Sequence, residues 1–362
     1  MDISQENSDY SSFQAFFKSI HYKMFFNKKI SIALITAGVV FAITNPYFIL
    51  DFESVQSSLK YEREVATGTL PVFYTRTFID TTPVLFQLKS VLPFISGPLF
   101  TIFGTLATVA MLIWSLAQSN QKSLKVLVVM AVLYGYLIIH LSSYVKWTRY
   151  MIPVLPFMAI SFVWMWEKLL KWIKSKTIQI ILATIIVMII FEVGMRGLSF
   201  FTLYTQPDSR VEAATWTAEN IPQDATILSE VYDPSILPFN APIGNQITIF
   251  NMYDLYDPVN PRLSEVEKLS ELLATSDYIL LPSRRGYKTA LRLPNRFTLN
   301  ANYYNHLFNG GLGFEEVYSL DREPCLVPQY LNKTDLLRSW LCPVDVQKAE
   351  ETFVTFDHSS VK

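Results

Sequence analysis

The chain of 362 residues is 51% hydrophobic and carries a formal net charge of −1, and most of its apolar residues lie in blocks before residue 205. A charge so close to zero provides no long-range attraction to nucleic acid, so we expect no nucleic-acid partner. The uneven apolar distribution predicts a membrane-embedded first part followed by a globular second part.

Long charge-free stretches fill the first part. About 20 helical residues cross the hydrocarbon core of a bilayer, and a helix pairs its own backbone groups there. The stretches that approach this length are 30–50, 90–121, 126–145, 150–166 and 177–191, the last continuing past Glu192. We therefore expect a membrane α-helical bundle of about five spanning helices within residues 30–203, with an outer loop at 51–89.

The positions of the lysines predict the orientation of these spans, because cytoplasmic flanks are enriched in Lys and Arg. Two spans separate each lysine group from the next, and the groups are Lys18, Lys23, Lys28 and Lys29; Lys122 and Lys125; and Lys168, Lys171, Lys174 and Lys176. One membrane face then carries all of them. We expect residues 1–29 to be a cytoplasmic N-terminal segment, and the loop 51–89 and the domain 204–362 to be extracytoplasmic.

The second part mixes helical and strand patterns. It predicts helices at 211–220 and 263–274 and short apolar strands at 225–229 and 278–281. Such alternation favours a C-terminal extracytoplasmic α/β domain over a β-sandwich. The Asn-Gly-Gly-Leu-Gly sequence at 309–313 lacks the Lys-Ser/Thr of a phosphate loop, so we interpret it as a turn.

The two cysteines, Cys325 and Cys342, are too few and too far apart for a zinc site of the CxxC type, and the four histidines do not cluster. We therefore predict no metal site. A disulfide is one expectation for an oxidising compartment, and two free, partly buried thiols are an equal alternative.

A basic pair marks the outer end of the third predicted span. On a helical turn Lys146, Arg149 and Tyr150 would share one face at the depth of a lipid phosphate, which arginine can bind through two parallel hydrogen bonds. In the alternative, Lys146 and Arg149 extend to headgroups, and Trp147 and Tyr150 belong to the interfacial aromatic belt. His140, within the span, is expected to make a contact inside the bundle.

Several short motifs follow one another along the chain. Those of the first part are Thr44-Asn45-Pro46-Tyr47 with Asp51, Tyr74-Thr75-Arg76, Thr81-Thr82-Pro83, Gly97-Pro98, and Arg149-Tyr150-Met151 with Pro153. Those of the second part include Ala213-Ala214-Thr215-Trp216, Asn220-Ile221-Pro222, Ser283-Arg284-Arg285, Arg292-Leu293-Pro294, Leu312-Gly313-Phe314-Glu315 and Phe356-Asp357-His358. In this order they resemble the carboxyl half of GT-C fold membrane glycosyltransferases, which are protein O-mannosyltransferase-like and family 39-like.

The resemblance implies transfer of a sugar from a polyprenyl-phosphate donor to an acceptor on the outer membrane face. Enzymes of this family use a carboxylate base in their first outer loop, in a chain with many more spans. No position here matches that base, so the catalytic residue is unknown. The chain would be a fragment, a split half whose missing N-terminal spans lie on a separate chain, or an inactive relative.

The resemblance also suggests roles for individual residues. Arg149, Lys146 and Tyr150 would contact the donor phosphate at the membrane lipid boundary, with Arg76 and Tyr74 near the donor. The residues expected to structure the outer loop are Asn45, Pro46, Tyr47 and Asp51. No cofactor is implied beyond the polyprenyl-linked sugar itself.

Two functions of other classes remain as alternatives. One is a non-catalytic membrane subunit whose outer domain binds a glycan or a protein. The other is a carrier of lipid-linked sugars or small solutes, which ranks last because the sequence shows no paired, Gly/Pro-broken spans in related halves.

Overall fold

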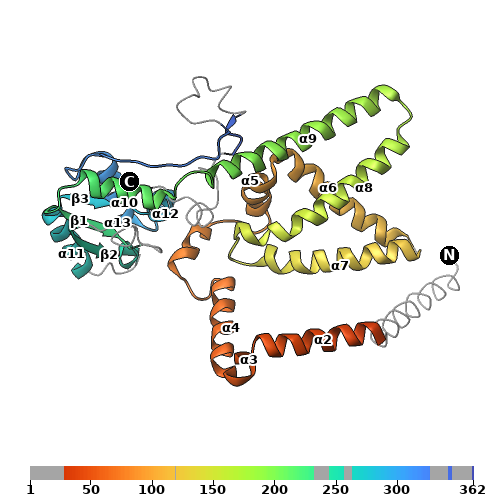
Figure 1. Cartoon of the computed structure of the whole chain (residues 1–362), viewed down its shortest axis with the longest axis horizontal. Helices are drawn as coiled ribbons and strands as arrows, with labels where there is room; N and C mark the ends of the chain where they lie inside the picture. Colours follow the sequence, from red (N-terminus) through yellow and green to blue (C-terminus); the bar gives the residue numbers. More distant parts are fainter. Residues whose placement is uncertain (1–27, 119, 232–243, 257–262, 327–340, 345–360) are drawn as a thin grey trace. The chain divides into compact units, whose positions relative to one another are not determined.

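The computed structural model describes residues 28–118, 120–231, 244–256, 263–326, 341–344 and 361–362 (Figure 1). The chain divides into two compact units, Met1–Val65 and Ala66–Lys362. Most of the predicted cytoplasmic segment 1–29, and the Phe356-Asp357-His358 motif, lie outside the described residues.

The first unit contains an apolar helix, a single turn and most of a polar helix, which extends two residues past Val65. Helix α2 spans Lys28–Thr44, α3 spans Tyr47–Leu50, and α4 begins at Phe52 and ends at Thr67. The span expected over 30–50 is therefore wrong as one helix, because Pro46 has no amide hydrogen with which to continue the helical hydrogen bonding. The Asn45 amide and its side-chain Nδ2 both donate to the Phe41 carbonyl, at 2.9 Å and 3.1 Å, in the last turn before the break. The apolar helix Ser31–Thr44 is shorter than the full spans.

The residues expected to structure the outer loop lie at this interruption. Asn45 and Pro46 connect α2 to α3, Tyr47 begins α3, and Asp51 ends it. The Asp51 Oδ1 also accepts a hydrogen bond from the Ser54 amide at 3.3 Å, which satisfies a free donor in the first turn of α4. Much of the segment expected as a loop is thus helical.

The second unit contains four helices long and apolar enough to cross a membrane: Pro98–Ala117, Lys122–Ser142, Thr148–Trp172 and Lys176–Leu203. Apolar helices of sufficient length therefore lie at four of the five predicted spans. The helices are α6 (Pro98–Ala117), α7 (Gln121–Ser142), α8 (Leu155–Trp172) and α9 (Lys176–Leu203).

Shorter helical turns precede and separate these spans. They are the 3₁₀ turns Phe73–Phe78, Thr148–Tyr150 and Ile152–Val154, the π turn Gln87–Val91, and α5 (Leu92–Ser96). The stretch expected as one span over 90–121 is divided at Gly97, whose φ of 82° is left-handed, so α6 starts afresh at Pro98.

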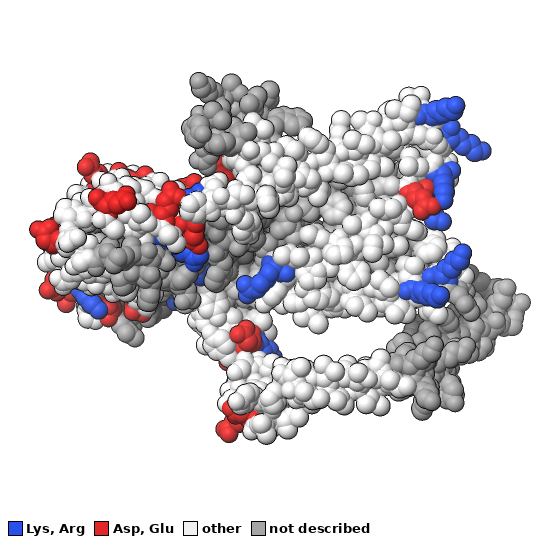
Figure 2. Space-filling view, viewed as in Figure 1, with Lys and Arg blue, Asp and Glu red and all other residues white. Residues whose placement is uncertain are grey.

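Helix α6 packs against α7 and α8 (Figure 1). Helix α8 approaches α6 closely at Gly104, where an added Cβ would lie 2.9 Å from the Met158 Cε and 3.4 Å from its Cβ. Lysines gather at the end where α6 and α8 finish and α7 and α9 begin (Figure 2). The segment 143–150 and the carboxyl end of α9 therefore lie at the opposite end of these helices.

The α/β domain is built on a three-stranded parallel sheet of order β2-β1-β3. Its strands are β1 (Thr226–Glu230), β2 (Gln246–Phe250) and β3 (Tyr278–Leu280). Its helices are α10 (Ser209–Asn220), α11 (Leu263–Thr275), α12 (Arg284–Arg292) and α13 (Thr298–Phe308), with the 3₁₀ turn Met252–Tyr256 after β2. The structure confirms the predicted helices at 211–220 and 263–274 and the predicted strands at 225–229 and 278–281. Strand β2 was not predicted from the sequence.

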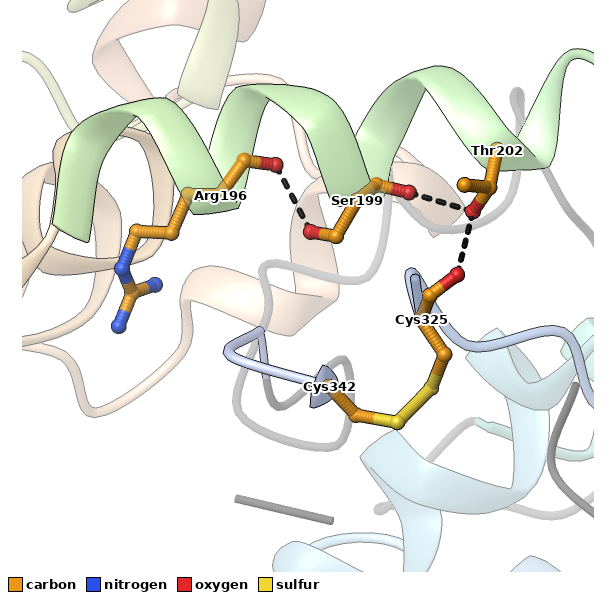
Figure 3. The surroundings of a disulfide bond; sticks show 5 residues. All are labelled: Arg196, Ser199, Thr202, Cys325 and Cys342. Atoms are coloured by element: carbon orange, nitrogen blue, oxygen red, sulfur yellow. Dashed lines mark hydrogen bonds between the residues drawn. A yellow bond between two sulfur atoms is a disulfide. The ribbon is translucent and has the colours of Figure 1, made fainter. Parts of the chain in front are cut away.

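A disulfide joins Cys325 and Cys342, whose Cα atoms are 4.1 Å apart. It lies beside α9, where the Thr202 Oγ1 donates a hydrogen bond to the Cys325 carbonyl at 2.8 Å (Figure 3). The same hydroxyl also lies 2.7 Å from the Ser199 carbonyl one turn earlier. The cross-linked segment is thereby attached to the carboxyl end of the last apolar helix.

Candidate functional site

Two segments converge at the helix end opposite the lysines. The Tyr144 Oη donates to the Thr75 carbonyl at 3.3 Å, and the Tyr144 amide donates to the Ala66 carbonyl at 3.0 Å. Gly68 permits this approach because its φ is 76° and an added Cβ would lie only 2.6 Å from the Tyr144 ring. The 3₁₀ turn Phe73–Phe78 is therefore held against residues 143–150.

An aromatic cluster fills this junction. The Trp147 ring centre lies 4.6 Å from that of Phe78 and 6.1 Å from that of Tyr74. The predicted residues Tyr74 and Arg149 both contact Trp147, since the Arg149 guanidinium carbon lies 5.1 Å from its ring centre. Sequence analysis placed these residues in separate segments, and the structure brings them to one place.

Lys146 takes a different position from the predicted one. Helix α7 ends at Ser142 and the next helical turn begins at Thr148, so Lys146 and Arg149 share no helical face, and that prediction is wrong. The Lys146 side chain is buried, with the residue only 2% exposed, and its Nζ donates to the Tyr144 carbonyl at 2.6 Å. Burial also excludes the alternative in which Lys146 extends to lipid headgroups.

The surroundings of the Lys146 ammonium explain how it is accommodated. Its Nζ lies 5.6 Å from the Phe78 ring centre and 5.4 Å from that of Tyr144, where the ring faces attract a cation. Burial lowers the pKa of Lys146 to about 8. Lys146 is therefore enclosed within the junction at an electrostatic cost and is poorly placed to hold a phosphate.

Arg149 is exposed and lies at the start of the third apolar helix. Its guanidinium contacts the rings of Trp147 and Tyr150, at 5.1 Å and 5.5 Å, and it forms no ion pair with any carboxylate in the part of the chain that the structure describes. A planar guanidinium held by stacking keeps its donors available for the paired oxygens of a phosphate.

Tyr150 is anchored from the helix interior. Its carbonyl accepts a hydrogen bond from the Tyr136 Oη at 2.8 Å, and its ring centre lies 4.7 Å from that of His140. The His140 ring also contacts Tyr136 at 4.2 Å. The predicted contact of His140 inside the bundle is therefore confirmed as ring packing against Tyr136 and Tyr150. It does not satisfy the imidazole, whose Nδ1 is buried without a hydrogen-bond partner among the described residues.

The α/β domain contacts the same 3₁₀ turn. Arg292 donates to the Thr77 carbonyl at 3.0 Å and to the Ile79 carbonyl at 3.1 Å. Arg76 lies 6.0 Å from the ring centre of Tyr253, which itself contacts Phe73 at 4.6 Å. No sequence pattern indicated a role for Tyr253 or Arg292, although Arg292-Leu293-Pro294 is one of the short motifs of the second part.

A buried carboxyl group lies at the carboxyl edge of the sheet, the edge at which open parallel sheets bind ligands. Glu230 ends β1 and is only 8% exposed, and its Oε2 accepts a hydrogen bond from the Tyr304 Oη at 3.0 Å. Its Oε1 has no hydrogen-bond partner among the described residues. Burial raises the pKa of Glu230 to about 8, and the Tyr304 hydrogen bond opposes part of that rise.

Close packing leaves little room around this carboxyl group. A Cβ at Gly286 would lie 2.8 Å from the Tyr304 Oη and 3.6 Å from the Glu230 Oε2. Glu230 and Tyr253 line the same cavity of about 10 Å³, which is too small for a substrate. Nothing in the sequence pattern distinguished Glu230 from an ordinary strand-end residue.

The described residues contain no group of three or more His, Cys, Asp or Glu side chains that could hold a metal ion. Comparison of the chain with protein-family models, with curated proteins and with solved structures finds no match. Function is therefore argued from the residues themselves.

Proposed function

We propose that this chain is a membrane glycosyltransferase, as a fragment or a split half, which transfers a sugar from a polyprenyl-phosphate donor to an acceptor on the outer membrane face. The lysine-rich helix end would be cytoplasmic by the positive-inside rule. The junction around Trp147 and the α/β domain that follows α9 would then be extracytoplasmic.

The observation that carries the proposal is the exposed guanidinium of Arg149 among aromatic rings at the boundary of the apolar helices. A polyprenyl phosphate would place its anionic group at this depth. In sugar transfer the phosphate leaves as an anion, and a paired arginine stabilises the charge that develops on it.

The other predicted residues would act around this contact. Tyr74 would shape the donor side through its contact with Trp147, and Arg76 would contribute a second positive charge beside Tyr253. Lys146 would stay enclosed in the junction and leave the phosphate to Arg149. The carboxylate base would come from a separate chain that carries further spans.

The test is donor capture in membranes that contain the whole chain. A photoreactive polyprenyl phosphate should label the parent, and Arg149→Ala should reduce labelling about tenfold, because a charge-assisted hydrogen bond contributes about 1.5–3 kcal/mol. Arg149→Lys should recover only part of it, because a lysine lacks the two parallel donors. The matched control is Lys171→Ala, an exposed cation at the opposite helix end whose partner is Glu167.

Sugar transfer is measured in the same membranes with a radiolabelled donor, with and without candidate partner chains. Transfer that requires a partner and is lost in Arg149→Ala would support a split enzyme. Equal labelling of the parent, Arg149→Ala and Lys171→Ala would refute the donor site.

A second function is a non-catalytic membrane subunit whose outer domain binds a glycan or a protein. The observation that favours it is a cavity of about 850 Å³ in the α/β domain, which is within the size range of ligand pockets. Ligand binding by that domain without any donor labelling would select this function.

A further inference from the structure

We infer that the large cavity of the α/β domain is a binding site for a neutral saccharide, separate from the Arg149 site. The cavity, of about 850 Å³, is bounded by α10, β3, α13 and the segment Gly310–Tyr318. None of Tyr74, Arg76, Lys146, Arg149 and Tyr150 lines it. The inference rests on the geometry of this domain and does not depend on the proposed transfer reaction.

Aromatic side chains form much of the cavity wall. Trp216 of α10 and Tyr318 are stacked, with ring centres 4.5 Å apart and planes at 22°. Tyr278, Phe308 and Phe314 also line the cavity. Flat, rigid rings offer apolar contact area at little entropic cost, and the C–H face of a pyranose ring is complementary to them.

The polar groups of the cavity favour hydroxyl groups as their partners. The Tyr318 Oη is buried and has no hydrogen-bond partner among the described residues. A phenol is protonated at neutral pH, and burial together with the nearby Glu212 carboxylate raises the pKa of Tyr318 further, so the hydroxyl can donate as well as accept. A sugar hydroxyl satisfies either role.

The charges in the cavity act against anionic ligands. Asp277, Glu315 and Glu316 supply three carboxylates and Lys362 one ammonium. The Thr226 amide and hydroxyl each donate to the Asp277 Oδ2, at 2.8 Å and 2.9 Å, and Lys362 pairs with Glu316 at 2.8 Å. Glu315 is exposed and has no ion-pair partner in the described part of the chain. Its carboxylate can therefore accept hydrogen bonds from sugar hydroxyls, and its negative charge repels a phosphate.

The turn at 309–313 borders this cavity. The turn prediction is confirmed, since Gly310 and Gly313 have φ of 72° and 81° and the Gly313 amide donates to the Gly310 carbonyl at 3.0 Å. Both glycines line the cavity, and a Cβ at Gly313 would meet nothing within 4 Å. The turn therefore leaves open space beside Phe314 and Glu315 for a ligand.

The test uses the whole chain in phospholipid nanodiscs, because maltoside detergents are themselves saccharides. Saturation-transfer NMR is recorded with three neutral tetrasaccharides, of mannose, glucose and N-acetylglucosamine, each at millimolar concentration. We expect transfer to at least one of them. Trp216→Ala and Tyr318→Phe should each weaken binding about tenfold, since each removes one principal contact.

Two variants separate the loss of a ligand contact from a loss of folding. Tyr318→Phe keeps the ring stack and removes only the hydroxyl, so its effect reports on ligand contact rather than folding. Trp172→Ala, at a residue that is 79% exposed on α8, is the matched control and should leave binding unchanged. No transfer to any tetrasaccharide, equal binding in all variants, or binding only of a Lys-rich tetrapeptide would overturn the inference.

Discussion

Replacing Glu230 with glutamine should make the stability of the α/β domain less dependent on pH. The carboxyl group is buried at the end of β1, and among the described residues it accepts one hydrogen bond, from Tyr304. Glutamine has the same shape, can accept the same hydrogen bond and never ionises, so Glu230→Gln imitates the protonated side chain.

The size of the effect follows from the pKa. Glu230 shifts from its usual 4.5 to about 8 in the folded chain, and about 1.4 kcal/mol for each pH unit gives a stability change on the order of 5 kcal/mol. The folded state binds this proton more tightly than the unfolded state. The contribution is therefore complete below about pH 4.5 and is lost as pH rises to about 8.

The assay is the thermal midpoint of the intact chain in nanodiscs, followed by near-ultraviolet circular dichroism between pH 5 and pH 9. The midpoint of the parent should fall relative to that of Glu230→Gln by on the order of 10 °C across this range, because about 1 kcal/mol shifts a domain of this size by a few degrees. Subtracting the midpoint of Glu230→Gln from that of the parent at each pH removes the effect of the other titrating groups, which the two chains share.

The matched control is Glu219→Gln, which removes an exposed carboxylate from α10 and should follow the parent at every pH. A constant difference between the parent and Glu230→Gln from pH 5 to pH 9 would refute the reasoning. It would mean that Glu230 is ionised in the folded chain throughout this range.

Three further variants test other parts of the fold by the same thermal midpoint. Gly97→Ala should destabilise the chain by more than about 1 kcal/mol, because alanine is strained at a φ of 82° and its Cβ would lie 2.8 Å from the Glu192 carboxyl carbon. An unchanged midpoint would contradict this geometry. Lys146→Met should raise the midpoint at pH 7, because it replaces a buried ammonium with an apolar side chain, and it should leave polyprenyl-phosphate labelling intact. Loss of labelling would mean that Lys146 contacts the phosphate. Replacing Cys325 and Cys342 with serine should lower the free energy of unfolding by about 3 kcal/mol, as expected for a loop closed by residues 17 positions apart. A thermal midpoint equal to that of the parent would show that the disulfide does not restrain the unfolded chain.

Sequence determined those features that depend on local chemistry. Four apolar helices follow from run length, because a bilayer requires about 20 helical residues whatever surrounds them. The turn at 309–313 follows from glycines that adopt positive φ without strain. The interruption at Pro46 could also have been predicted, since proline cannot continue the hydrogen bonding of a helix, but the apolar run on both sides of it concealed the break.

Tertiary structure decided which polar side chains are buried and which remain accessible. Lys146 and Arg149 have the same charge and lie three residues apart, yet one is enclosed by Phe78 and Tyr144 while the other is exposed beside Trp147. Because α7 ends at Ser142 and the next helical turn begins only at Thr148, the two residues share no helical face, and no local pattern fixed these ends.

The same holds for the α/β domain. Glu230 becomes a high-pKa carboxyl group because helices more than 50 residues later in the chain pack over it and remove it from water, which outweighs the hydrogen bond from Tyr304. The cavity beside Trp216 likewise exists only where distant segments meet. Burial and cavity shape depend on contacts between segments far apart in the sequence, so periodicity and spacing, which report on one segment at a time, could not predict them.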